Sequence, residues 1–248
     1  MRRTLFISDL HLSATQPDIT AAFFDFLDTQ VTDEVDALYI LGDFFEVWVG
    51  DDANEPLSDE VAARLKTISE HGIKVYFIHG NRDFLLGQKY AQRAGMTLLP
   101  EQTVINLYGT PTLLLHGDEM CTQDVEYQKF RKKSRGWWWP KLMLSMPLWY
   151  RRRVARNARI KSKMSQQNKR AEILDVEPSS VSETFTQHNV ALMIHGHTHR
   201  PAIHSHGENT RIVLGDWYTQ ASYLVATEHC ISLHYANEIK EFCLANQS

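Results

Sequence analysis

Residues 190–199 read VALMIHGHTH, a short apolar run that ends abruptly in histidines around a glycine. Short apolar runs bounded by turn residues are typical of strands that are buried on both faces. Comparable runs that close on Asp, Asn, His or Gly occur at residues 4–7, 37–41, 74–78 and 112–115. The pattern predicts several buried strands with polar side chains gathered in the loops that follow them.

Amphipathic stretches separate the first of these strands, at residues 18–30, 57–71 and 84–94. Their apolar spacing predicts helices. We expect Ser58 to cap the start of the second helix and His71-Gly72 to end it. Alternating strands and helices predict a mainly parallel sheet with a site at the carboxyl ends of its strands.

Beyond residue 200 the expected strands follow one another without intervening helices. They cover residues 211–214, 221–226 and 230–235, with turns at 215–216 and 227–229. We expect these strands to form a second, largely antiparallel sheet that packs on the first. The fold class is therefore predicted to be an α/β sandwich of two sheets flanked by helices.

Residues 121–170 break the alternation of strands and helices. They contain WWWP at 137–140, an apolar run at 142–150 and then many arginines and lysines. We predict a helical insertion that caps the site, within a single domain that spans residues 1–248. Tryptophan beside arginine suits the interfacial depth of a membrane surface.

Composition and charge limit the class of protein. The formal net charge of −4 argues against a generic nucleic-acid binder. Cys121, Cys230 and Cys243 are too far apart to predict a disulfide framework or a CxxC site. No apolar run is long enough to span a membrane, and no leader precedes the first strand. We expect a cytoplasmic monomer that binds no nucleic acid and lies on an anionic membrane surface.

Carboxylate, amide and imidazole groups at the strand ends predict a metal centre. Oxygen and imidazole ligands without thiolates suit Mn²⁺, Fe²⁺ or Zn²⁺. Two such ions held about 3.5–4 Å apart by a bridging carboxylate activate a water molecule against a phosphate. The candidate ligands are Asp9, His11, Asp43, Asn81, His116, His197 and His199.

Four further polar residues accompany these motifs. We expect His79 and His195 to support the ligands or to pack, and not to bind metal themselves. For Asp83 and Asp118, orienting a ligand and forming a turn remain alternatives.

Five motifs occur in an order that resembles the calcineurin-like metallophosphoesterases: Asp9-x-His11, Gly42-Asp43, Gly80-Asn81-Arg82-Asp83, His116-Gly117-Asp118 and Gly196-His197-Thr198-His199. The resemblance implies two Mn²⁺ ions per chain, and Fe²⁺ or Zn²⁺ would suit the same ligands. It implies that the first ion is held by Asp9, His11, Asp43 and His199. It implies that the second is held by Asp43, Asn81, His116 and His197, with Asp43 bridging.

Arg82 departs from many relatives, which carry histidine at this position. Histidine can protonate a poor alkoxide leaving group, as a general acid. A phosphate leaving group is already stable as an anion and benefits instead from a permanent positive charge. Arg82 therefore favours a phosphoanhydride substrate over a phosphomonoester. The candidate catalytic residues are Asp43, Asn81, Arg82 and His116.

The variants GNRDF at 80–84 and LGDFFE at 41–46, together with the insertion, narrow the resemblance. They are similar to the family of pyrophosphohydrolases that act on UDP-2,3-diacylglucosamine in lipid A biosynthesis. That similarity implies attack of water on the α-phosphate, giving UMP and 2,3-diacylglucosamine 1-phosphate, at the cytoplasmic face of the bacterial inner membrane. It implies substrate contacts from Asn81, Arg82, Asp124, Ser162, Gln166, Lys169 and His197.

Three other functions remain alternatives. A diadenosine tetraphosphatase or a phosphodiesterase for a soluble nucleotide would have no need for the apolar insertion. A metal-dependent nuclease would need a basic groove, which the acidic net charge disfavours. A binding scaffold of the same fold would have no chemical need for the complete set of ligands.

Overall fold

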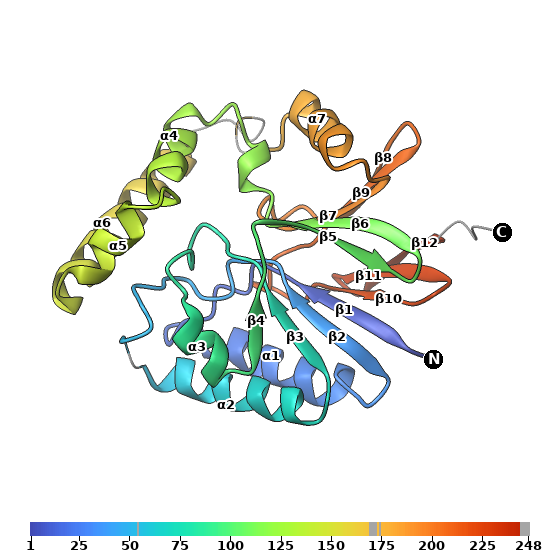
Figure 1. Cartoon of the computed structure of the whole chain (residues 1–248), viewed down its shortest axis with the longest axis horizontal. Helices are drawn as coiled ribbons and strands as arrows, with labels where there is room; N and C mark the ends of the chain where they lie inside the picture. Colours follow the sequence, from blue (N-terminus) through green and yellow to red (C-terminus); the bar gives the residue numbers. More distant parts are fainter. Residues whose placement is uncertain (54, 169–172, 174, 244–248) are drawn as a thin grey trace.

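The computed structural model of the chain describes residues 1–53, 55–168, 173 and 175–243. These residues form two β-sheets that face each other, with helices on the outer faces (Figure 1). The seven-stranded sheet has the order β12-β11-β10-β1-β2-β3-β4, and the five-stranded sheet has the order β5-β6-β7-β9-β8. The strands are β1 (Arg3–Ile7), β2 (Val35–Ile40), β3 (Lys74–Phe77), β4 (Met96–Leu98), β5 (Gln102–Leu107), β6 (Thr110–Leu115), β7 (Leu192–His195), β8 (Ala202–His206), β9 (Asn209–Val213), β10 (Tyr223–Ala226), β11 (Cys230–Tyr235) and β12 (Glu238–Cys243). The predicted α/β sandwich of two sheets flanked by helices is confirmed, and both sheets are mixed.

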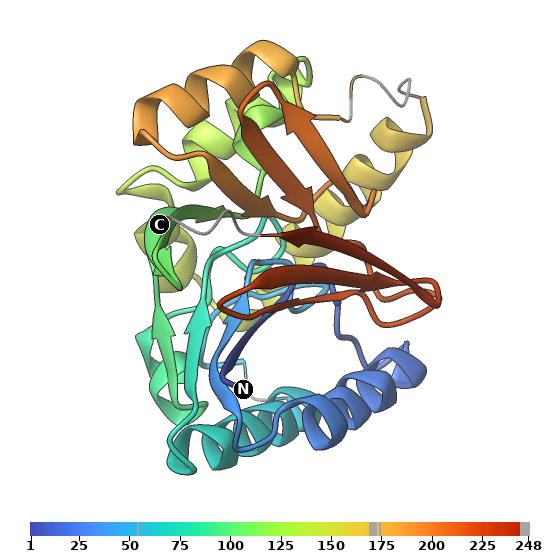
Figure 2. The same cartoon turned by 90° about the vertical axis from the view of Figure 1, so that its right-hand side faces the viewer.

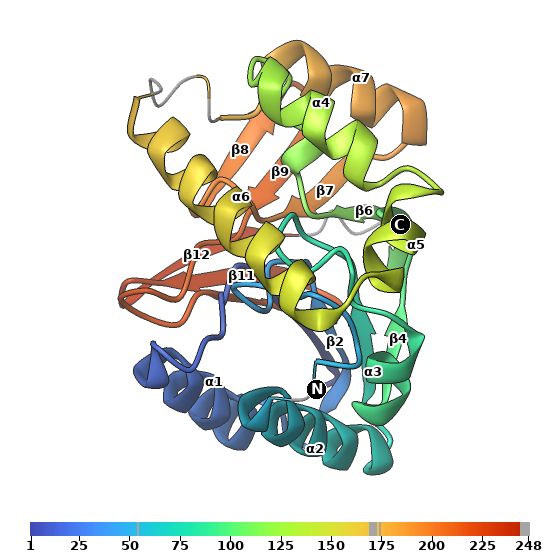
Figure 3. The ribbon, with the colours of Figure 1, turned by 90° about the vertical axis from the view of Figure 1, so that its left-hand side faces the viewer.

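The helices divide into three groups. Helices α1 (Pro17–Gln30), α2 (Pro56–Glu70) and α3 (Gln88–Arg93) cover the seven-stranded sheet, and α7 (Pro178–His188) covers the five-stranded sheet (Figure 1). Helices α4 (Val125–Ser134), α5 (Trp139–Ser145) and α6 (Leu148–Asn168) lie together on one side of the molecule (Figure 3). The helical insertion is therefore confirmed as far as residue 168. Among the described helices, none is long and apolar enough to cross a membrane.

Three apolar clusters hold these layers together. Phe23 and Leu38 belong to the cluster between the seven-stranded sheet and its helices. Leu114 lies in the cluster between the two sheets, whereas Leu113 lies beneath α7 with Phe185. Adjacent residues of β6 thus serve different layers, because successive side chains of a strand point to opposite faces. Figure 2 shows the stacked layers from the side.

The predicted division of strands between the sheets was wrong. Strand β10 pairs antiparallel with β1, from Thr4 opposite Ala226 to Ile7 opposite Tyr223, and β11 and β12 extend the same sheet. Strands β6 and β7, which were expected in that sheet, lie parallel in the other one. The free edge of β1 needs hydrogen-bond partners, and β10 supplies them. Local apolar patterns do not reveal which edge a later strand will take.

Helices α1 and α2 confirm the predicted helices at 18–30 and 57–71, and His71 ends α2 as expected. The predicted cap of α2 was wrong, since Glu55 is the N-cap residue and Pro56 follows it. Proline suits this position because its fixed φ is already helical and the N–H that it lacks would have no partner inside the helix. The Ser58 hydroxyl instead donates to the Glu55 carbonyl, over 2.8 Å.

The third helix is shorter than the predicted 84–94, since α3 begins only at Gln88. Asp51 accepts hydrogen bonds from the backbone amides of Gly87 (2.8 Å) and Tyr90 (3.0 Å), and so fixes the start of α3. Asp83 accepts from the amide of Gly80 over 2.8 Å and holds the preceding residues in turns. The hydrogen bonds that these carboxylates accept from the backbone keep the helix from beginning earlier.

Candidate metal centre

Seven polar side chains meet at one end of the sandwich, in the loops after β1, β2, β3, β6 and β7. The first group consists of Asp9, His11 and His199, whose ligand atoms all lie within 4.8 Å of one another. His199 Nε2 is 3.2 Å from His11 Nε2 and 3.4 Å from Asp9 Oδ1. These three side chains therefore form one half of a candidate metal centre.

The second group surrounds Asn81. Asn81 Oδ1 lies 2.9 Å from His197 Nδ1 and 3.1 Å from His116 Nε2, and the two imidazole nitrogens are 3.2 Å apart. His116 Nδ1 is 2.8 Å from the Leu41 carbonyl, which leaves Nε2 to face the site. The orientation of His116 is thus set by the backbone of the loop after β2.

Asp43 lies between the two groups. Its Oδ2 is 4.0 Å from His11 Nε2, and its Oδ1 is 3.6 Å from His116 Nε2. Asp9 also approaches both groups, since it can share a metal-sized site with Asp43 and His116. Both carboxylates therefore lie between the histidines of the two groups, where they could contact a divalent cation.

The distances between these atoms fit divalent metal ions. Ligand atoms about 2.0–2.2 Å from one ion lie about 3 Å from each other, the separation seen around Asn81. Turning the Asn81 amide would let its NH₂ group donate to His197 and His116 instead. With the amide as it stands, Asn81 Oδ1 and the two imidazole nitrogens point at one another and could bind one cation together. Asp9 Oδ1 is also buried without a hydrogen-bond partner among the described residues. A cation would satisfy both.

The backbone around the centre is strained. Residues other than glycine rarely adopt positive φ, and such strain concentrates at functional sites. The candidate ligands with φ between 51° and 68° are Asp9, His11, Asp43, His197 and His199. Glycine is required beside them, because a Cβ on Gly80 would lie 2.2 Å from Asp43 Oδ1 and one on Gly196 would lie 2.2 Å from Asp9 Oδ2.

The electrostatics of the site favour cations. Burial lowers the pKa of His199, but Asp9 and Asp216 outweigh it and raise the pKa to about 10. Burial raises the pKa of Asp9, yet His199, His116 and His11 hold it well below its usual range. Burial and the neighbouring His116 lower the pKa of His197 to about 4, which keeps this imidazole neutral and able to bind metal.

The four accompanying residues support the loops. His79 Nε2 is 2.7 Å from the Leu86 carbonyl, and His195 Nδ1 is 2.8 Å from the Gly196 carbonyl. Asp83 also accepts from the amide of Phe44 over 2.7 Å, so its carboxylate ties two loops together. Asp118 accepts from the hydroxyl of Tyr127 and, over 2.9 Å, from Arg131 Nε.

Two carboxylates beside the ligands were not identified from the sequence. Asp216 Oδ2 is 3.0 Å from His199 Nδ1, and Glu46 Oε2 is 3.3 Å from His11 Nδ1. Burial raises the pKa of Glu46, but hydrogen bonds with His11 and Arg159 lower it to about 2. Glu46 belongs to the LGDFFE motif, which could have pointed to it as a residue of the site. The sequence indicated only a turn at Asp216.

A cavity of about 290 Å³ extends from the metal centre beneath the insertion. Five of the seven predicted substrate contacts line it: Asn81, Arg82, Asp124, Ser162 and His197. Lys169 lies outside the described residues, as does the side chain of Gln166. Asp124 also caps α4, where its Oδ1 accepts from the amide of Tyr127 over 3.0 Å.

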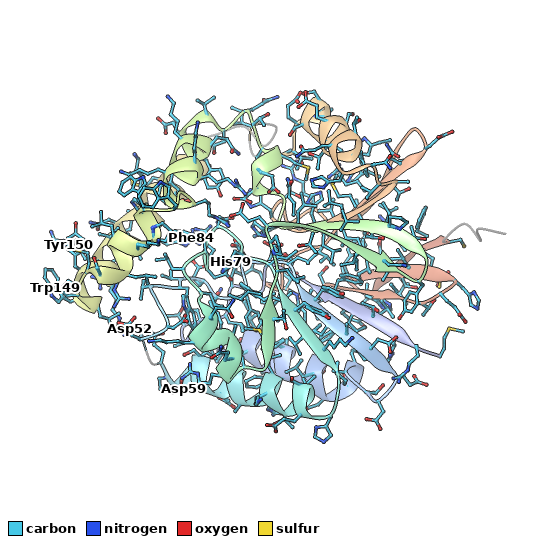
Figure 4. The ribbon with its side chains drawn as sticks, viewed as in Figure 1. Asp52, Asp59, His79, Phe84, Trp149 and Tyr150 are labelled. Atoms are coloured by element: carbon cyan, nitrogen blue, oxygen red, sulfur yellow. The ribbon has the colours of Figure 1, made fainter. Side chains whose placement is uncertain are left out.

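Most of the remaining wall of the cavity is apolar. Phe84, which Figure 4 labels, packs against Phe130 and Trp139 of the insertion, with ring centroids 6.4 and 5.8 Å apart. Further apolar walls come from Leu85, Met143, Val154, Ala155 and Ala158. The cavity thus joins polar residues of the metal centre to an apolar chamber.

Known proteins resemble this chain in sequence and in fold. A sequence profile of the calcineurin-like phosphoesterase family matches residues 2–201. A protein of Shewanella piezotolerans named UDP-2,3-diacylglucosamine hydrolase is 54% identical, over 93% of this chain and 97% of its own length. Proteins of the same name from Serratia proteamaculans and Escherichia coli are 50% and 47% identical, over 93% of this chain and 97% of their lengths.

Among solved structures, vacuolar protein sorting 29 from Cryptosporidium parvum has a similar fold. The TM-score is 0.53 with 13% identity, and the match covers 98% of both chains. At this identity the similarity concerns the fold alone. With a family profile that matches four fifths of its length and relatives about half identical over nearly all of it, the chain belongs to the calcineurin-like phosphoesterase family.

Proposed function

We propose that this chain hydrolyses the pyrophosphate bond of UDP-2,3-diacylglucosamine, giving UMP and 2,3-diacylglucosamine 1-phosphate. The observation that carries the proposal is the shape of the cavity, which continues from Asn81, Arg82 and His197 into an apolar chamber under the insertion. A soluble nucleotide would leave that chamber without a role, whereas acyl chains would fill it. Relatives of about 50% identity carry the corresponding name.

The reaction is a displacement at the α-phosphorus. A bond forms between the water oxygen and the α-phosphorus, the bond to the bridging oxygen breaks, and that oxygen leaves with the sugar phosphate. Two Mn²⁺ ions would supply Lewis-acid activation of the water and of the phosphate. We assign the first ion to Asp9, His11, Asp43 and His199, and the second to Asp43, Asn81, His116 and His197.

Arg82 has the role of stabilising the leaving phosphate. Its backbone amide donates to Asp43 Oδ1 over 2.8 Å, which fixes it beside the metal centre, and its side chain lines the cavity. A guanidinium remains charged throughout turnover and matches two phosphate oxygens at once. Asp124, Ser162, Gln166 and Lys169 complete the proposed set of substrate contacts.

We infer that the protein binds the cytoplasmic surface of the inner membrane through the insertion. Trp137 and Trp149 are 80% and 67% exposed, and Figure 4 shows Trp149 at the outer edge of the molecule. Exposed arginines of α6, among them Arg153 and Arg156, accompany these rings. Aromatic side chains beside basic ones suit an anionic lipid surface.

The proposed function is tested by comparing substrates. The Mn²⁺-loaded protein would be incubated with UDP-2,3-diacylglucosamine, ADP-ribose, diadenosine tetraphosphate and single-stranded DNA. We expect UMP from the first and slow or no cleavage of the others. Preferred cleavage of diadenosine tetraphosphate or of DNA would contradict the proposal and favour the soluble phosphodiesterase or the nuclease.

A further inference from the structure

Glu46 connects the metal centre to the insertion. On one side its Oε2 lies 3.3 Å from His11 Nδ1, and on the other its Oε1 accepts a hydrogen bond from Arg159 Nε. His11 is a candidate ligand in the loop after β1, whereas Arg159 belongs to α6. Glu46 itself follows β2, so three separate segments of the chain meet at this one carboxylate.

The contact with Glu46 accounts for the outer nitrogen of His11. The His11 side chain is 1% exposed, and both His11 Nδ1 and Glu46 Oε2 are buried. Within the described part of the chain, neither atom makes a hydrogen bond that meets the usual geometry, and each faces the other at 3.3 Å. Histidines that bind metal through one nitrogen commonly donate from the other to a carboxylate, which fixes the tautomer and the ring orientation. With Nδ1 protonated, the lone pair of Nε2 faces His199 and Asp43.

Arg159 in turn holds Glu46. The guanidinium and the carboxylate are about three quarters buried, so their attraction is screened less than that of a surface pair. Arg159 also lines the cavity, where a ligand that fills the chamber would contact α6. The position of α6 and the orientation of His11 therefore depend on the same carboxylate.

A second arginine of α6 provides a comparison. Arg151 Nη1 donates to Asp52 Oδ1 over 2.7 Å and to the Val49 carbonyl over 2.6 Å. This pair ties the same helix to the same loop as Glu46 does. Its partner Asp52 is absent from both groups of candidate metal ligands and does not line the cavity. Asp52 thus contributes to the seating of α6 without contacting the metal centre.

We propose that Glu46 is a positioning residue that orients His11 toward the first metal ion and that Arg159 of the insertion holds Glu46 in place. The inference rests on the proposed function in one respect, namely that His11 is a metal ligand. The affinity for the first ion then depends on the contact between Glu46 and the insertion. Whatever effect a ligand bound under α6 has on the ion at His11, the ion has the same effect on that ligand, because such coupling is reciprocal.

The experiment is a calorimetric titration of the metal-free protein with Mn²⁺ alone, in the wild type and in four variants. Glu46→Ala should weaken the binding of one ion of the pair by about 10- to 100-fold, the usual effect of losing a carboxylate behind a metal-bound histidine. Glu46→Gln should weaken it less, since an amide oxygen still accepts from Nδ1–H. Arg159→Ala should weaken the binding of the same ion. Asp52→Asn, the matched control, should leave the affinities for both ions unchanged.

Wild-type affinity for both ions in Glu46→Ala would overturn the proposal. Equal weakening by Arg159→Ala and Asp52→Asn would also overturn it, because the effect would then come from loosening α6 and not from the contact with Glu46. Glu46→Gln, which keeps the size of the side chain, serves as the test should Glu46→Ala fail to fold, and unchanged affinity there contradicts the proposal. A wild type that binds two ions but cleaves no UDP-2,3-diacylglucosamine would refute the proposed function alone.

Discussion

The backbone amide of Arg82 donates to Asp43 Oδ1 over 2.8 Å, and Arg82 Nε lies 3.7 Å from Asp43 Oδ2. The proposed bridging ligand and the proposed leaving-group residue are thus held against each other by the chain itself. Gly80 makes this approach possible, since any Cβ there would collide with the backbone nitrogen of Asp43 at 2.1 Å. The loops after β2 and β3 therefore act as one unit.

Removal of the bridging carboxylate should abolish catalysis. We expect Asp43→Ala to lower kcat by several orders of magnitude, because both ions lose a shared ligand. Steady-state hydrolysis and metal analysis of the purified variant measure the two effects together. Asp43→Asn, of nearly equal volume, is the control for packing. Near-normal turnover in Asp43→Ala would exclude a bridging role.

Arg82→His tests the argument about the leaving group. Histidine would restore the general acid of many relatives but remove the permanent charge, and we expect kcat for the anhydride to fall about 10²- to 10³-fold. The same variant should lose less activity on an aryl phosphodiester, whose leaving group carries only one negative charge. Arg82→Lys, which keeps a charge without the planar fork, should lie between the two. An unimpaired Arg82→His variant would show that the charge is not needed.

Ala155→Trp should obstruct the apolar chamber. Ala155 lines the cavity, so the indole would displace acyl methylenes, each of which contributes about 0.8 kcal/mol when buried. We expect KM for the diacyl substrate to rise on the order of tenfold or more, while kcat on a small aryl phosphodiester stays at the wild-type value. Asn157→Trp, an exposed position on the same helix outside the cavity, should change neither constant. Equal KM values in the two variants would show that the acyl chains do not bind in this chamber.

Charge reversal on the insertion should weaken membrane binding. Each basic residue near an anionic surface contributes about 1 kcal/mol, so Arg153→Glu with Arg156→Glu should greatly reduce flotation with phosphatidylglycerol vesicles. Arg2→Glu with Lys74→Glu changes the same charge at exposed positions, at the amino-terminal ends of β1 and β3. Should both double variants float equally well, the insertion is not the membrane-binding surface.

The sequence identified the side chains that gather at the candidate metal centre more fully than it predicted the sheets around them. Asp9, His11 and His199, which the fold brings together, could be singled out because each stands in a short motif directly after an apolar run, and such motifs are local. The pairing of β10 with β1 depends on contacts more than 200 residues apart along the chain, as with Thr4 and Ala226, and no local pattern encodes it. Glu46 was visible as part of a motif, but its contact with Arg159 needed the position of α6.

The measurement that tests the proposed reaction most directly is hydrolysis of UDP-2,3-diacylglucosamine in ¹⁸O-labelled water, with mass analysis of both products. Attack on the α-phosphorus puts the label in UMP and leaves 2,3-diacylglucosamine 1-phosphate unlabelled. We predict that result for the Mn²⁺-loaded wild type. Label in the lipid phosphate, or no UMP at all, would contradict it.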